Sequence, residues 1–254
     1  MRRIALAFVL VVLVAGFALA DKGVFFEYEI KLEGSGVPPE MAQMGKMIVR
    51  TWLQGDLFKM ETNQGSIILR KDKGVVWIID SDRKQYLEFP FSMFEGMMKS
   101  AKQQAETMET QYEYKKTGRK NKIGRWNCYE VVIKFKDPTN PQVEHKSVIW
   151  MTKDAELDPK KLAEAFEWDW FGTTKYNKDV LKHSELDGFP VRIITEDHTQ
   201  QGVVKSIMTL TDFQHKSFPM STFELPKGYT KIQMPQMPQG MGGGQPMPMP
   251  PQGQ

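Results

Sequence analysis

Residues 115–135 read KKTGRKNKIGRWNCYEVVIKF and contain the longest apolar alternation in the chain. Side chains spaced by two share one face of a β-strand, and here they are Tyr129, Val131, Ile133 and Phe135. The opposite face carries Trp126, Cys128 and Val132. Apolar residues on both faces indicate a strand that is covered on both sides.

Two turns are predicted before this strand. An earlier strand ends at Tyr112 and Tyr114, a charged turn follows at Thr117-Gly118, and a second turn lies at Ile123-Gly124. The first turn is rich in basic residues, namely Lys115, Lys116, Arg119, Lys120 and Lys122. We interpret them as the solvated tip of a hairpin, with contact to phosphate headgroups as the alternative.

Residues 1–20 have the pattern of an export signal. Arg2 and Arg3 precede an apolar run that ends in the small residues of Ala18-Leu19-Ala20. The run is short for a membrane span, which needs about 20 residues, so a retained anchor is the less favoured alternative. No cysteine near the cleavage point offers a thiol for a lipid. We therefore expect cleavage after Ala20 and a periplasmic or secreted protein without a stable membrane anchor.

Charge and cysteine content limit the classes of protein. The chain has 34 basic and 31 acidic residues, and removal of Arg2 and Arg3 brings it nearer to balance. Such a balance argues against a nucleic-acid binder. The single cysteine, Cys128, excludes an internal disulfide framework and is expected to be a small buried residue.

The remaining pattern predicts an antiparallel meander. Residues 24–32 alternate, with Phe26, Tyr28 and Ile30 on the buried face and glutamate and lysine on the wet face. Short strands separated by glycine or polar turns follow at 47–53, 57–62, 67–69, 75–79, 86–89, 146–152, 191–196 and 203–213. The domain should span 21–232, because residues 233–254 consist only of Met, Pro, Gly and Gln, carry no charge and are predicted to be disordered.

Two helices interrupt the meander. Ser92, with Glu95 three residues later, has the spacing of a helix cap, and an apolar stripe continues to about Thr107. Asp158-Pro159 is a favourable start for a second helix, which runs to Phe171 and contains Phe166, Trp168 and Trp170. These elements together predict an α+β domain.

Four phrases give a resemblance to a known family. They are KIGRWNCYEV at 122–131, SVIWMTKD at 147–154, DGFPVR at 187–192 and FELPKGY at 223–229. In this order they resemble the exported bacterial family called domain of unknown function 4412, which is similar to the periplasmic lipoprotein-carrier fold. The resemblance implies a strongly curved antiparallel half-barrel with helices packed on its concave face, where carriers hold acyl chains. The roughly ten strands and two helices predicted above agree with this architecture. It implies no catalytic or binding residue.

No catalytic motif is found. The four histidines lack H-E-x-x-H spacing, and no G-x-S-x-G sequence occurs. We therefore predict a non-enzymatic protein without a cofactor. Calcium binding by Asp154, Glu156 and Asp158 is disfavoured, because the segment lacks the glycine turn of a calcium loop.

The sequence therefore favours a binding protein for an apolar or lipid-like ligand in the cell envelope. The predicted lining is Phe26, Tyr28, Ile30, Tyr129 and Val131, with Phe166, Trp168 and Trp170 as a lid; ordinary core packing of these aromatics is the alternative. A second hypothesis is an envelope protein-interaction module with no ligand, contacting its partner through 233–254. A third is copper(I) binding by methionine clusters. These lie at Met41, Met44 and Met47, at Met93, Met97 and Met98, and from Met234 to Met249, and the last cluster, in the tail, is the preferred place.

Overall fold

The computed structural model describes residues 23–43, 45–97, 112–137, 140–155, 188–199 and 202–233. The strands of these residues form one twelve-stranded sheet. They are β1 Val24–Glu33, β2 Met47–Gln54, β3 Leu57–Glu61, β4 Gly65–Arg70, β5 Val75–Asp80, β6 Gln85–Pro90, β7 Tyr112–Ile123, β8 Trp126–Asp137, β9 Asn140–Thr152, β10 Phe189–Thr199, β11 Gly202–His215 and β12 Thr230–Lys231.

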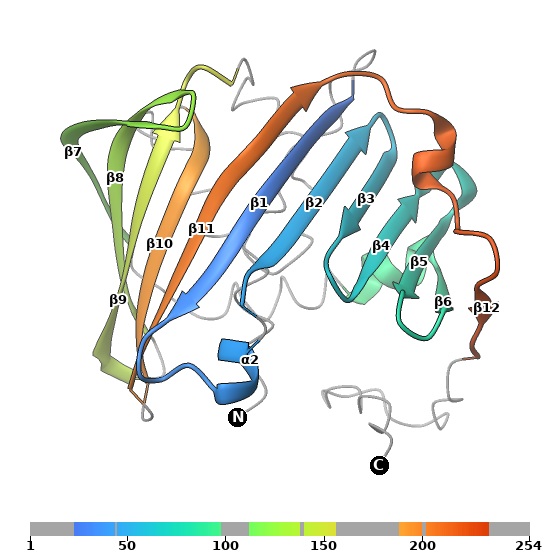
Figure 1. The fold of residues 1–254 in the computed structure, drawn as a ribbon, viewed down its shortest axis with the longest axis horizontal. Coiled ribbons are helices and arrows are strands. Elements are labelled where there is room, and N and C mark those ends of the chain that lie inside the picture. Colours follow the sequence, from blue (N-terminus) through green and yellow to red (C-terminus); the bar gives the residue numbers. More distant parts are fainter. Residues whose placement is uncertain are drawn as a thin grey trace.

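The sheet joins two meanders through its central strands. Its order is β12-β6-β5-β4-β3-β2-β1-β11-β10-β9-β8-β7, so β1 lies between β2 and β11. Neighbouring strands are antiparallel, except that β12 pairs parallel with β6. Figure 1 shows the sheet bent into an open arch, with β7–β9 at one end and β4–β6 at the other. The predicted curved antiparallel sheet is therefore present, but with twelve strands instead of roughly ten.

Irregular register accompanies the curvature. The pairing of β1 with β11 shifts between Glu27 and Tyr28, and that of β9 with β10 shifts between Pro190 and Arg192. Such bulges bend a strand and increase its twist. The skipped residue of β11, Thr211, donates a hydrogen bond from Oγ1 to the carboxylate of Glu27 at 2.8 Å.

The predicted turn at Thr117-Gly118 is wrong. Strand β7 continues through this pair, and its register against β8 shifts between Lys116 and Lys120. Gly118 has φ = 80°, a left-handed conformation that suits glycine in a bulge as well as in a turn. The basic side chains therefore lie along an edge strand, where charge also discourages pairing with another sheet.

The described helices are short. Helix α2, Pro39–Gln43, was not predicted from the sequence. Residues 91–97 are helical, so the helix already includes Ser92 and this serine is not its cap. Met93 and Phe94 of this helix pack against the main core. The remainder of the predicted helix, the second helix at 158–171 and the terminal segments 1–20 and 234–254 lie outside the described residues.

Two apolar clusters pack on opposite faces of the sheet, because they take alternate residues of the same strands. The main core reaches from Phe89 of β6 to Ile123 of β7 and contains buried side chains from every strand between them. A second cluster joins Trp77 and Ile68 to Phe223 and Phe218. The segment 216–232, here called the C-terminal strap, carries these last two residues and passes β3–β5 on its way to β12 (Figure 1).

Candidate functional site

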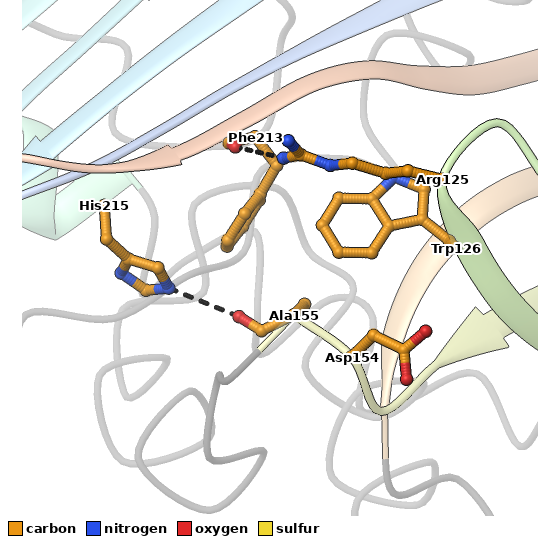
Figure 2. Close-up of a pocket in the computed structure, with 6 residues that line it drawn as sticks. All are labelled: Arg125, Trp126, Asp154, Ala155, Phe213 and His215. Atoms are coloured by element: carbon orange, nitrogen blue, oxygen red, sulfur yellow. Dashed lines mark hydrogen bonds between the residues drawn. The ribbon is translucent and has the colours of Figure 1, made fainter.

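A cavity of about 350 Å³ opens where β8 begins and where β9 and β11 end. Six described side chains and backbone groups line it: Arg125, Trp126, Asp154, Ala155, Phe213 and His215. Figure 2 shows that they come from three separate segments and surround the opening. Trp126, Ala155 and Phe213 are buried, whereas the three titratable residues are exposed.

The hairpin between β7 and β8 positions Arg125. Ile123 pairs with Trp126, so Gly124 and Arg125 form a two-residue loop. Gly124 has φ = 57°, as expected for glycine at the first position of a tight hairpin. The guanidinium carbon of Arg125 lies 4.5 Å from the centre of the Trp126 ring, and Nη2 donates a hydrogen bond of 2.5 Å to the carbonyl oxygen of Phe213 (Figure 2).

The end of β9 is tied to the start of β8. The buried hydroxyl of Thr152 donates to the carbonyl of Asn127 at 2.9 Å and accepts the backbone N–H of Asp154 at 3.1 Å. The backbone N–H and side-chain amide of Asn127 both donate to Oδ2 of Asp154, at 2.9 and 3.1 Å. These bonds hold the Asp154 carboxylate at the rim of the cavity.

The end of β11 supplies the third wall. The Phe213 ring meets the Trp126 ring edge to face at 5.8 Å and the His215 ring at 5.1 Å. Nε2 of His215 lies 3.2 Å from the carbonyl oxygen of Ala155 (Figure 2). Because a carbonyl only accepts, this nitrogen carries a proton and donates it.

A row of aromatic rings leads from the cavity into the main core. Phe213 contacts Phe189 at 5.1 Å between ring centres, and Phe189 contacts Phe26 at 5.8 Å. Phe26 in turn meets Tyr28 at 5.9 Å. The wall of the cavity is therefore continuous with residues that the sequence predicted to line a ligand site.

The five described residues of the predicted lining all belong to the main core. Phe26, Tyr28 and Ile30 lie on β1, and Tyr129 and Val131 lie on β8. Each is at most 9 % exposed, and none of them lines the cavity described above. The predicted lid residues Phe166, Trp168 and Trp170 lie outside the described residues.

Tyr28 contributes an aromatic face and no available hydroxyl. Its hydroxyl donates to the carbonyl of Pro190 at 2.6 Å, and burial raises the pKa of this phenol well above its usual value. The side chain therefore stays neutral and is tied to β10.

The sequence matches a family model over residues 40–229, described as a domain of unknown function, DUF4412. The chain belongs to this family. The match includes all four phrases that suggested the resemblance, so the predicted membership is confirmed. A search of curated proteins finds no match.

Three solved structures are similar at low identity. A LolA superfamily protein from Nitrosomonas europaea is 11% identical, with 81% of this chain and 91% of that chain covered and a TM-score of 0.31. A DUF1329 family protein from Desulfovibrio piger ATCC 29098 is 10% identical, with 80% and 90% covered and a TM-score of 0.28. A putative outer membrane lipoprotein-sorting protein domain from Vibrio parahaemolyticus is 10% identical, with 80% and 89% covered and a TM-score of 0.25.

Sequence reasoning missed most of this cavity. Arg125, Phe213 and His215 were not predicted as site residues, although the glycine turn beside Arg125 was recognised. Arg125 and Phe213 are 88 residues apart in the chain, and no local pattern indicates that they meet. Asp154 was considered only as a calcium ligand, and its carboxylate instead accepts hydrogen bonds from Asn127; Glu156 and Asp158 lie outside the described residues.

The His, Cys, Asp and Glu side chains of the described residues form no group of three that could hold a metal ion. Met47 and Met93 pack against the main core, which is the gap-filling role of methionine. Within the described ranges, no helix is long and apolar enough to cross a membrane.

Proposed function

We propose that this protein is an exported, non-enzymatic binding protein for an apolar or lipid-like ligand of the cell envelope. The observation that carries the proposal is the cavity at the ends of β8, β9 and β11, with its wall of Trp126 and Phe213. The lipoprotein-sorting description of the Vibrio structure belongs to that protein, and the proposal does not depend on it.

The size and lining of the cavity support this role. Small-molecule sites are concave, hold about 300–1,000 Å³ and combine apolar walls with a few polar groups. The present cavity, of about 350 Å³, falls at the lower end of that range. Its buried wall is aromatic, and its polar groups stand at the rim.

The aromatic row supplies a direction for a longer ligand. From Phe213 the rings continue through Phe189 to Phe26, so an apolar chain would meet apolar surface beyond the cavity. The residues Phe26, Tyr28, Ile30, Tyr129 and Val131 are proposed as the inner lining, and Phe166, Trp168 and Trp170 as the lid. Because the inner lining is buried, binding there requires side chains of the core to separate.

The proposal is tested with the full chain, purified after expression with its own N-terminal segment. Native mass spectrometry should detect a co-purified amphiphile, and stripped protein should bind added dodecanoic acid. Replacing Ala155 by leucine should weaken this binding about tenfold, because the larger side chain occupies the cavity. The matched change Ala42→Leu, on the exposed part of α2, should leave binding unchanged. Ligand-free protein that also ignores dodecanoic acid would refute the proposal.

A deletion of residues 233–254 separates this role from a protein-interaction module. The described residues that line the cavity all lie between 125 and 215, so we expect a carrier lacking the tail to keep its ligand. A variant that keeps its fold and loses its ligand on this deletion would contradict the proposal.

A further inference from the structure

We propose that the ligand carries a singly charged anionic oxygen group and that Arg125 binds this group at the mouth of the cavity. The inference rests on the proposed function and specifies the class of ligand. An amphiphile of this kind would place its chain against Trp126 and Phe213 and its anionic end at the rim.

Arg125 is held in position before any ligand arrives. Its guanidinium stacks on the Trp126 ring at 4.5 Å and donates from Nη2 to Phe213. A guanidinium has five N–H donors in one plane, so a single hydrogen bond leaves most of them unused. Planar N–H pairs match the geometry of carboxylate and phosphate oxygens, and a stacked guanidinium loses little entropy on binding them.

No described carboxylate competes for this guanidinium. The ion pairs of the described residues include none with Arg125, and Asp154 directs Oδ2 toward both N–H groups of Asn127. Arg125 is therefore a cation at an aromatic cavity without an acidic partner in this part of the chain. A ligand anion would supply that partner.

The other charged groups of the rim restrict the anion. Asp154 lies on the same rim, and its negative charge opposes a second negative charge on the ligand. Nε2 of His215 donates to the carbonyl of Ala155, so this N–H is not available to the ligand. Arg125 is thus the cation that faces the ligand, and Asp154 repels additional negative charge. This arrangement favours a carboxylate or a phosphodiester over a doubly charged phosphate.

Four probes distinguish the contribution of the head group to binding from that of the apolar chain. They also distinguish a carboxylate from a phosphodiester as the anion. They are dodecanoic acid, dodecylphosphocholine, dodecanol and acetate, each titrated into the full, stripped chain. We expect dodecanoic acid and dodecylphosphocholine to bind at least about tenfold more tightly than dodecanol, because charge-assisted hydrogen bonds are the stronger ones. Acetate, which lacks the chain, should not bind measurably.

The variant Arg125→Gln should remove this preference. It should weaken binding of dodecanoic acid about tenfold and leave dodecanol within about twofold. Arg125→Lys keeps the charge but not the planar pair of N–H donors. Its affinity for dodecanoic acid should lie between those of the unchanged protein and Arg125→Gln. Arg83→Gln makes the same charge change in the exposed turn between β5 and β6 and should alter neither affinity. Circular dichroism confirms that each variant is folded.

The outcomes distinguish this inference from the proposed function. Equal binding of dodecanoic acid and dodecanol by the unchanged protein overturns the inference and leaves an apolar carrier. Equal losses for both probes in folded Arg125→Gln also overturn it, because Arg125 would then only shape the cavity. Failure of every probe to bind overturns both proposals.

Discussion

Arg119 places Nη2 2.8 Å from Oε1 of Glu130, a carboxylate whose side chain is only 2% exposed. The hydroxyl of Thr117 donates to the same oxygen at 2.8 Å. Both partners come from the bulge of β7, which therefore brings two donors to one carboxylate of the neighbouring strand β8. The bulge does more than bend an edge strand, since it neutralises a buried charge.

Removal of Arg119 should therefore destabilise the protein although this side chain is exposed. We expect Arg119→Ala to lower the free energy of unfolding by about 2 kcal/mol, because the Glu130 carboxylate stays buried with a single partner. In the double variant with Glu130→Gln, most of this loss should disappear. Urea denaturation followed by tryptophan fluorescence measures both. Additive effects would contradict the coupling, and Lys120→Ala, on the same bulge, is the control.

The C-terminal strap should depend on Arg70. This guanidinium is buried, forms ion pairs with Asp72 at 2.6 Å and with Glu224, and contacts the carbonyl of Phe223. Arg70→Met should lower the free energy of unfolding by about 2 kcal/mol and make the strap more susceptible to proteolysis. Limited proteolysis with mass mapping should find new cuts between 216 and 232. Cuts only elsewhere would show that the second apolar cluster alone holds the strap.

The same contacts predict a loss of stability in acid. Hydrogen bonding from Arg70 lowers the pKa of Asp72 against the opposing effect of burial. For Glu224, burial raises the pKa, but the hydrogen bonds from Lys73 and Arg70 outweigh this effect, so the pKa is lowered overall. Both carboxyls thus bind protons less readily when folded, so their stabilisation is complete above their unfolded pKa values, about 3.9 and 4.3.

Stability should consequently fall as the pH drops below about 4 and through the lowered folded pKa values. Both side chains are partly exposed, so solvent screens the effect and keeps it modest. Thermal unfolding between pH 2 and 6 measures the slope. Arg70→Met should have the shallower slope in this window, and an unchanged slope would assign the acid sensitivity to other carboxyls.

Replacement by alanine should have opposite effects on stability at two glycines. A Cβ at Gly65 would lie 2.1 Å from the carbonyl oxygen of Ile79 on β5, and this backbone atom cannot move without breaking the ladder. We expect Gly65→Ala to cost about 3 kcal/mol. A Cβ at Gly96, in the helical residues 91–97, meets nothing within 4 Å, so Gly96→Ala should stabilise by about 0.5–1 kcal/mol. Chemical denaturation of both variants tests this, and equal effects would contradict it.

Cys128 should be unreactive until the protein unfolds. Burial raises the pKa of its thiol, and the nearby charge of Asp154 acts in the same direction. Little thiolate is then present near neutral pH. In addition, Cys128 is only 4% exposed. A thiol reagent such as Ellman's reagent should react about 100-fold more slowly with native than with urea-unfolded protein. Rapid labelling of the native chain would show that β8 opens locally.

Alternation of apolar and polar residues predicted the strands well, because burial of one face of a strand places an apolar residue at every second position of the sequence. The strand of residues 24–32 was predicted with its buried face, and Phe26 and Tyr28 are indeed fully buried. The turn at Thr117-Gly118 was wrong because a glycine with positive φ serves a hairpin or a bulge equally. Only the pairing of Lys116 with Val131 and of Lys120 with Tyr129 decides between them.

The cavity could not be predicted for a different reason. Its walls come from the hairpin tip at Arg125, the end of β9 and the end of β11, and they meet through long-range strand order. Single-sequence patterns report the faces of a strand and its turns, but not which strand ends become neighbours. Helix α2 was missed because its five residues are too few for a helical period to be visible.

The position of β1 at the middle of the sheet governs the order in which the chain can fold. Val24 pairs with His215, so one side of β1 stays open until the chain as far as β11 is available to fold. Contacts between such distant residues slow folding, and an open apolar strand edge invites aggregation meanwhile. The unfolded protein should accordingly depend on chaperones until its last long strand has paired.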